Sequence, residues 1–141
     1  MSTHRFPTEE GAKEVAESLG VSVNDMLKCQ DWEYTFPSLS DLPRYERLYS
    51  EDGTSDLAKR VLGCFIFQCL EDSLSAGSPE ETVRTSLVRL VSDFHIHEDE
   101  FRYWAHEDDK HYNDFPEEGW HIMKLAREYK NVAEQGASSD R

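Results

Sequence analysis

Five of the six histidines lie within 27 residues of one another, and acidic side chains flank them. They are His95, His97, His106, His111 and His121. Imidazole and carboxylate groups are common metal ligands in proteins, so this stretch could hold a metal ion. The same residues are also typical of an ordinary solvated surface. We expect the solvated surface, with no bound metal or other cofactor, and keep a metal-binding enzyme that uses His95–His121 as an alternative.

Part of this stretch, HIHEDE at residues 95–100, resembles the HxHxDH motif of metallo-β-lactamase-type hydrolases. His95, His97 and Asp99 match that motif, but Glu100 stands where the motif ends in histidine. The resemblance implies a large αββα sandwich in which the motif follows a strand. This chain is too short and too helical in its pattern for that fold, so we reject the match.

The segment from Glu98 to Glu118 is the most acidic part of the chain. It holds nine acidic and two basic residues, a net charge of −7 that is half the total. Aromatic residues lie between the acids, and Tyr and Trp are frequent anchors where a partner binds, while carboxylates steer a basic partner. The ordinary alternative is a solvated acidic face whose aromatic rings point into the core. We predict that the partner-binding residues are Glu98, Asp99, Glu100, Tyr103, Trp104, Glu107, Asp108, Asp109, Tyr112, Asp114, Glu117 and Glu118.

The composition of the whole chain restricts the class of protein. The 141 residues include 29 Asp and Glu against 15 Lys and Arg, which gives a formal net charge of −14. This charge repels phosphate and disfavours direct binding of nucleic acid. Aromatic residues make up 11%, more than a disordered acidic tail would carry. No apolar run is long enough to cross a membrane, no secretory signal is visible, and the three cysteines are an odd number, so we expect a cytoplasmic protein without disulfides.

The apolar spacing is helical along almost the whole chain. It predicts an all-α bundle of about six or seven helices, arranged as tandem helical hairpins around a buried central helix at residues 55–74. Residues 1–135 are expected to form a single helical domain, in which the hairpin at residues 8–33 could be a sub-unit. Residues 136–141 are expected to be a frayed tail.

Within this fold, apolar residues cover nearly the whole circumference of the 55–74 helix, and Cys64 and Cys69 are expected to be buried there. Gly20 is expected to end the first helix and Ser22 to cap the second. Further helices are expected at residues 44–49, 78–94, 98–106 and 116–134.

Residues 12–32, AKEVAESLGVSVNDMLKCQDW, resemble the helix-turn-helix of bacterial transcriptional regulators. Gly20 matches the turn, and Met26 and Cys29 match inward positions of the second helix. The resemblance implies a nucleic-acid-binding regulator. However, residues 1–33 carry a net charge of −4, whereas a recognition helix should offer basic or amide groups to DNA. We therefore expect a helical hairpin that packs on the rest of the chain, and keep the regulator as an alternative.

In size, charge and fold class the chain resembles the bacterial immunity proteins that neutralise a cognate toxin. Many such toxins are nucleases with a basic cleft, which an acidic face with exposed aromatic rings can fill. We therefore expect a non-enzymatic inhibitor whose partner is a basic protein, either a toxin or a nucleic-acid-binding protein. The sequence favours no particular oligomeric state.

Overall fold

The computed structural model describes the backbone of residues 8–139 and the side chains of residues 8–135. All regular structure in that part of the chain is helical, which confirms the predicted all-α fold. The chain divides into two units, residues 1–69 and residues 70–141, and the long helix α5 runs across the boundary. None of the helices in the described residues is both long and apolar enough to cross a membrane.

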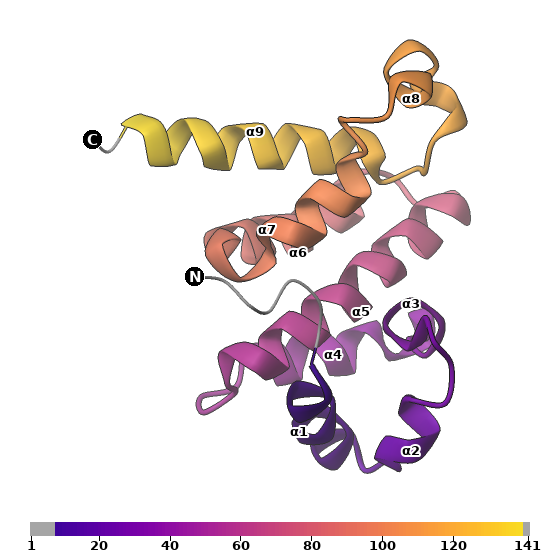
Figure 1. Cartoon of the computed structure of the whole chain (residues 1–141), viewed down its shortest axis with the longest axis vertical. Helices are drawn as coiled ribbons and strands as arrows, with labels where there is room; N and C mark the ends of the chain where they lie inside the picture. Colours follow the sequence, from indigo (N-terminus) through magenta and orange to yellow (C-terminus); the bar gives the residue numbers. More distant parts are fainter. Residues whose placement is uncertain (1–7, 140–141) are drawn as a thin grey trace. The chain divides into compact units, whose positions relative to one another are not determined.

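The first unit contains six elements. They are α1 (Glu9–Leu19), α2 (Val23–Met26), α3 (Trp32–Thr35), the 3-10 helix η1 (Leu39–Asp41), α4 (Leu42–Tyr49) and α5 (Asp56–Ser75) as far as Cys69. Figure 1 shows α1 to α4 gathered beside the first part of α5. The predicted stop and cap are confirmed, because Gly20 adopts φ 74° and the Asp25 amide donates to the Ser22 hydroxyl at 3.3 Å.

The α5 helix confirms the prediction of a buried central helix. Seven consecutive residues, 61–67, are buried, so no side of this part of the helix faces solvent. In the first unit the Phe65 ring contacts Trp32, Phe36 and Tyr45, with centroids 6.2, 5.6 and 5.3 Å away. Cys64 and Cys69 are buried as free thiols, as predicted.

A glycine and a carboxylate join α1 to the start of α5. A Cβ atom at Gly11 would lie 2.5 Å from the Leu57 carbonyl oxygen, so only glycine permits this close approach. The Glu14 carboxylate accepts from the Ser55 hydroxyl at 2.5 Å and from the Ser55 amide at 3.2 Å. Ser55 in turn caps α5 by accepting from the Ala58 amide at 3.1 Å. The first unit is therefore tied together at the N-terminus of its longest helix.

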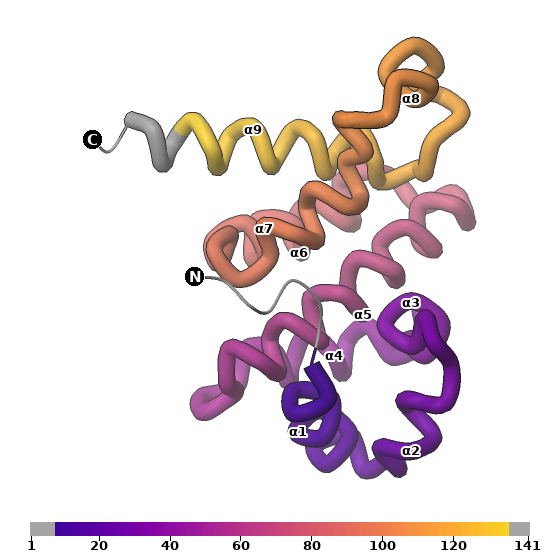
Figure 2. Tube along the Cα trace, in the orientation of Figure 1, coloured from indigo at the N-terminus to yellow at the C-terminus, as the bar shows by residue number. Residues whose placement is uncertain are grey.

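The second unit carries the acidic segment. After the end of α5 it contains α6 (Glu81–Ser92), α7 (Phe94–Ala105), α8 (Lys110–Asp114), the 3-10 helix η2 (Pro116–Glu118) and α9 (Met123–Ser139). The α7 and α9 helices pack closely, and α6 packs on both. The chain between α7 and α9, orange in Figure 2, projects from these packed helices as a loop that contains α8 and η2.

Several predicted helix boundaries are wrong. The helix expected at residues 78–94 is α6, which ends at Ser92 because Asp93 leaves the helical conformation, with φ −112° and ψ 40°. The next helix, α7, then begins at Phe94 rather than at residue 98, with the Ile96 amide donating to the Asp93 carbonyl at 2.8 Å. The last helix begins at Met123, after the separate η2 turn. It continues beyond Gly136, where a frayed tail was expected, to Ser139, and residues 140–141 lie outside the described residues.

The described residues form nine α-helices and two 3-10 helices, more than the six or seven expected. Two of the additional helices, α3 and α8, are single turns of four and five residues. Such short turns carry no repeated apolar spacing, which is why the sequence pattern does not predict them.

Candidate acidic binding surface

The acidic segment runs from α7 through the projecting loop, and its turn out of α7 is fixed by an arginine of α9. His106 ends α7 in the left-handed conformation, with φ 48°. The Arg127 guanidinium donates to the carbonyl of Ala105 at 2.6 Å and to that of His106 at 3.0 Å. These two hydrogen bonds satisfy carbonyl groups that the helix end leaves without a helical partner. The loop therefore leaves α7 in one defined direction.

The loop is held against α7 by a cluster of aromatic rings. His106 lies 4.4 Å from Trp120, 5.4 Å from Tyr112 and 5.9 Å from Tyr103, measured between ring centroids. Trp104 lies under this cluster, 4.5 Å from Trp120. Burial lowers the pKa of His106, Arg127 lowers it further, and Asp109 acts in the opposite direction. His106 is therefore a mainly neutral ring at physiological pH.

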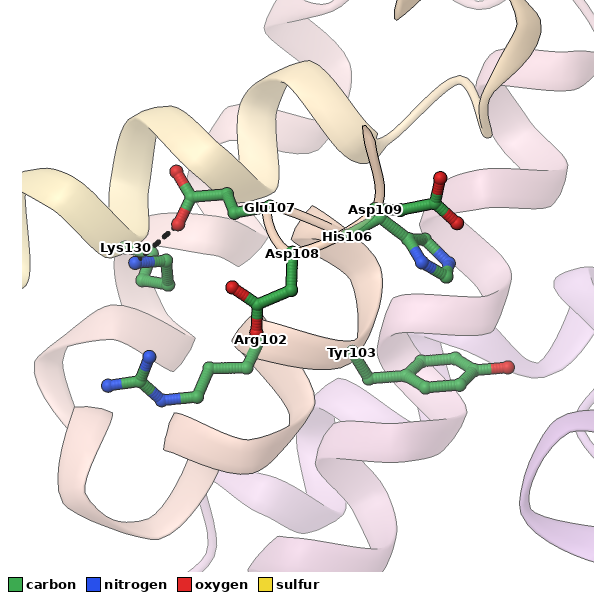
Figure 3. Close-up of a pocket in the computed structure, with 7 residues that line it drawn as sticks. All are labelled: Arg102, Tyr103, His106, Glu107, Asp108, Asp109 and Lys130. Atoms are coloured by element: carbon green, nitrogen blue, oxygen red, sulfur yellow. Dashed lines mark ion pairs between the residues drawn. The ribbon is translucent and has the colours of Figure 1, made fainter. Parts of the chain in front are cut away.

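A cleft of about 390 Å³ opens beside this cluster in the second unit. It is lined by Arg102, Tyr103, His106, Glu107, Asp108, Asp109 and Lys130. Figure 3 shows the rings of Tyr103 and His106 on one side, Arg102 and Lys130 on the other, and the Asp108 carboxylate between them. The cleft thus combines carboxylates with an aromatic wall.

The cationic side of the cleft is neutralised within the protein. The Lys130 ammonium, with 6% of its side chain exposed, lies 2.6 Å from a Glu107 oxygen and 3.0 Å from a Glu134 oxygen. Arg102 pairs with Glu98 at 2.7 Å and with Glu134 at 2.9 Å. Burial by itself would lower the pKa of Lys130, but its hydrogen bonds to the two carboxylates raise it overall. The bond from Lys130 is also the main cause of the lowered pKa of Glu134.

Two of the predicted contact residues are not on the surface, which corrects the sequence analysis. Glu100 is 8% exposed and Trp104 is 2% exposed. The Trp104 indole nitrogen donates to the Glu100 carboxylate at 3.1 Å, so the two residues satisfy each other in the interior. Their spacing of four residues places them on the same face of α7, and that face is the buried one. They support the surface from beneath and cannot contact a partner directly.

The other ten predicted residues are exposed or half-buried, and we call them the acidic surface. They are Glu98, Asp99, Tyr103, Glu107, Asp108, Asp109, Tyr112, Asp114, Glu117 and Glu118.

Several carboxylates of the acidic surface already have structural partners. Asp109 caps α8, accepting from the amides of His111 and Tyr112 at 2.9 and 3.3 Å. Asp114 pairs with Lys110 at 2.7 Å, and Glu118 lies 2.6 Å from the His111 ring. Among the described residues, Asp108 and Glu117 form no ion pair, and both are exposed. Part of the acidic charge therefore holds the loop together, and part of it faces solvent without compensation.

The histidines do not converge. His121 lies 2.9 Å from the Glu71 carboxylate, His111 contacts Glu118, and His106 lies in the aromatic cluster, while His97 is buried in α7. Residues 95–100 form part of α7 and do not follow a strand. No group of three or more His, Cys, Asp or Glu side chains in the described part of the chain is placed to hold a metal ion.

The helix-turn-helix resemblance at residues 12–32 does not extend to a recognition helix. The second helix of the pair, α2, is a single turn of four residues, and its Met26 is buried. Cys29, expected to point inward, is exposed. A single turn is too short to present a row of side chains to a DNA groove.

Sequence analysis missed Lys130, Arg127 and Glu134, which position the acidic surface from α9. A signal for Lys130 was available, because it continues the buried stripe of Met123 and Ala126 at spacings of three and four residues. A charged residue on an apolar stripe indicates a buried ion pair.

No protein-family model, curated protein or solved structure matches this chain.

Proposed function

We propose that this chain is a binding protein that uses its acidic surface to hold a basic protein partner, and that it acts by binding rather than by catalysing a reaction. The observation that carries the proposal is the presence of exposed, uncompensated carboxylates beside exposed aromatic rings. Asp108 lines the cleft together with Tyr103, which is 39% exposed, and Glu117 lies two residues after Phe115, which is 47% exposed.

The chemistry of this arrangement favours a basic protein over other partners. Uncompensated carboxylates attract positive charge over a distance and speed the encounter with a basic partner. Tyrosine and phenylalanine rings that lose water on binding supply affinity at short range. A net charge of −14 opposes contact with nucleic acid itself. The surface is therefore suited to a protein that presents arginine and lysine side chains.

We further propose that the chain is an immunity-type inhibitor in the cytoplasm, whose partner is a basic toxin or another protein with a nucleic-acid-binding cleft. An inhibitor of this kind must reach its target before the target reaches its substrate. Electrostatic steering provides such fast association. A gene for a basic toxin beside the gene for this chain would agree with this form of the proposal.

The proposal is tested by capture followed by kinetics. The tagged wild-type chain is used to isolate its partner from the native cell, and the association rate is measured by stopped-flow at low and high salt. The double variant Asp108→Asn/Glu117→Gln removes two charges that have no ion-pair partner among the residues described by the structure, so it should slow association about threefold or more at low salt. High salt should remove most of that difference, because salt screens exposed charges.

The matched control is Glu10→Gln/Glu17→Gln, which removes the same number of exposed charges from α1 in the first unit. It should change the association rate much less. A captured partner without a basic surface, or equal rates for the wild type and Asp108→Asn/Glu117→Gln, would contradict the proposed function.

A further inference from the structure

A second cavity in the second unit lies where residues 116–121 meet the first turns of α9, and Glu117 is the one residue of the acidic surface that lines it. Its volume is about 550 Å³, which is within the range of cavities that hold small molecules. The lining residues are Pro116, Glu117, Gly119, Trp120, His121, Met123, Lys124, Arg127 and Glu128. This lining combines an indole, a thioether and a proline ring with several charged groups.

The apolar wall is fixed by packing. The Trp120 ring lies 4.5 Å from Trp104, which is buried, so the indole cannot turn freely. The Met123 side chain lies against the backbone of Gly119, where a Cβ atom would be 2.6 Å from the Met123 sulfur. Because the indole is positioned before any ligand arrives, a flat apolar molecule would lose little free energy in ordering it.

A buried carboxylate fixes the orientation of the histidine at this cavity. The Glu71 side chain, which is 12% exposed, accepts from the Ile122 amide at 2.8 Å through one oxygen. Its other oxygen lies 2.9 Å from Nδ1 of His121, whose side chain is 57% exposed. A proton on Nδ1 satisfies this hydrogen bond, which leaves Nε2 available to a ligand.

The charge at the cavity differs from that of the acidic surface. Arg127 donates to two backbone carbonyls but has no carboxylate within ion-pair distance among the described residues. Lys124 is 73% exposed and lies 3.3 Å from Glu80. Of the two acids that line the cavity, Glu128 is matched by Arg84 at 2.8 Å, and Glu117 forms no ion pair within the described part of the chain. Arg127 is therefore the lining cation that lacks a carboxylate among the described residues, and an anionic group on a ligand would supply one.

From this combination we infer that the cavity binds a small planar aromatic carboxylate, with its ring against Trp120 and Pro116 and its carboxylate toward Lys124 and Arg127. The aromatic ring of such a ligand suits the apolar lining, and its carboxylate suits Arg127, which has no acidic partner in the described residues. No covalent step is involved.

The probe is 2-naphthoate, and the neutral comparison is 2-naphthalenemethanol, which keeps the ring and lacks the charge. Binding to the full chain is followed by two-dimensional ¹H–¹⁵N NMR. We expect saturable binding of 2-naphthoate with a Kd of about 1 mM or tighter, which is ordinary for a ligand of this size. The shifted amides should lie in residues 116–128, and the neutral probe should bind several-fold more weakly.

Two exposed residues that line the cavity give variants with opposite expected effects on ligand binding. Lys124→Gln should weaken 2-naphthoate binding roughly two- to fivefold, and Glu117→Gln should strengthen it by a similar factor, as expected for single exposed charges. Lys110→Gln is the control, because this lysine is 87% exposed but lies outside the cavity, and it should leave the Kd unchanged. None of the three side chains is buried, so all three variants should fold.

The inference is overturned if 2-naphthoate does not bind saturably, if the neutral probe binds equally well, or if the shifted amides lie outside residues 116–128. It is also overturned if Lys124→Gln and Lys110→Gln have the same effect. None of these outcomes bears on the binding of a basic protein, so failure here is distinguishable from failure of the proposed function.

Discussion

The buried lysine of α9 offers a quantitative test of how the acidic surface is held. Lys130→Met keeps the apolar part of a side chain that is 6% exposed and removes the ammonium that bonds to Glu107 and Glu134. Glu107 then loses its cation, whereas Glu134 keeps the bond from Arg102 at 2.9 Å. Because Glu107 lines the cleft, the substitution also loosens one wall of the acidic surface.

The loss of unfolding free energy expected for Lys130→Met lies between two limits. Removing one partner of a fully buried ion pair costs about 3–5 kcal/mol, and losing an exposed pair costs about 0–1 kcal/mol. Glu107 and Glu134 are 36% and 37% exposed, so water partly compensates both carboxylates. We therefore expect Lys130→Met to lower the free energy of unfolding by about 1–3 kcal/mol.

Lys110→Met is the matched control. Lys110 forms an ion pair with Asp114 at 2.7 Å, a distance close to that of the Lys130 pair, but its side chain is 87% exposed. Its loss should cost below about 0.5 kcal/mol. Both variants are measured by urea unfolding with far-UV circular dichroism. If Lys130→Met costs no more than Lys110→Met, the buried network does not stabilise the second unit.

The stability difference between the wild type and Lys130→Met should depend on pH. The folded-state pKa of Glu134 is lowered below its ordinary value of 4.5, mainly by its hydrogen bond from Lys130. The unfolded chain therefore takes up the proton on Glu134 more readily than the folded chain. The contribution of Glu134 to the free energy of unfolding is complete above pH 4.5 and is lost as the pH falls through the lowered pKa. The stability advantage of the wild type over Lys130→Met should shrink across that range.

Two further predictions concern the aromatic cluster and the first unit. The pKa of His106 is lowered from 6.5, chiefly by burial, so the contribution of His106 to stability is complete above pH 6.5 and decreases below it. In a plot of the unfolding free energy against pH, His106→Gln should therefore flatten the slope below pH 6.5. An unchanged slope would show that another group causes it. Gly11→Ala should lower the free energy of unfolding by about 1–3 kcal/mol, because its Cβ would meet the rigid Leu57 backbone, whereas Gly119→Ala meets the flexible end of Met123 and should cost less. Equal costs in a urea titration would show that α1 can move away from α5.

The sequence predicts the helical elements where the apolar pattern is long. The α5 helix follows from an unbroken apolar run, and the turn at Gly20 follows from the conformational freedom of glycine. The break at Asp93 was missed because apolar residues continue across it to Phe94. Its position is set by local hydrogen bonds, which leave no mark in the periodicity.

The sequence locates the acidic surface but does not show which of its carboxylates are free to meet a partner. Net charge counts every carboxylate equally, whereas the structure places Glu100 in the interior with Trp104 and uses Asp109 as a helix cap. The distinction depends on residues far along the chain, since Lys130 and Arg127 lie in α9. Within the described part of the chain, the structure shows that Asp108 and Glu117 are exposed acids of this surface that neither form an ion pair nor cap a helix.

The most direct test of the central claim is the association rate with the captured partner at low salt, measured for two variants that lose the same charge at different places. We predict that Asp108→Asn/Glu117→Gln slows association about threefold or more, while Glu10→Gln/Glu17→Gln leaves it close to that of the wild type. Equal slowing by the two variants would show that only the net charge of the chain acts. No slowing by either would contradict the claim that the acidic surface receives the partner.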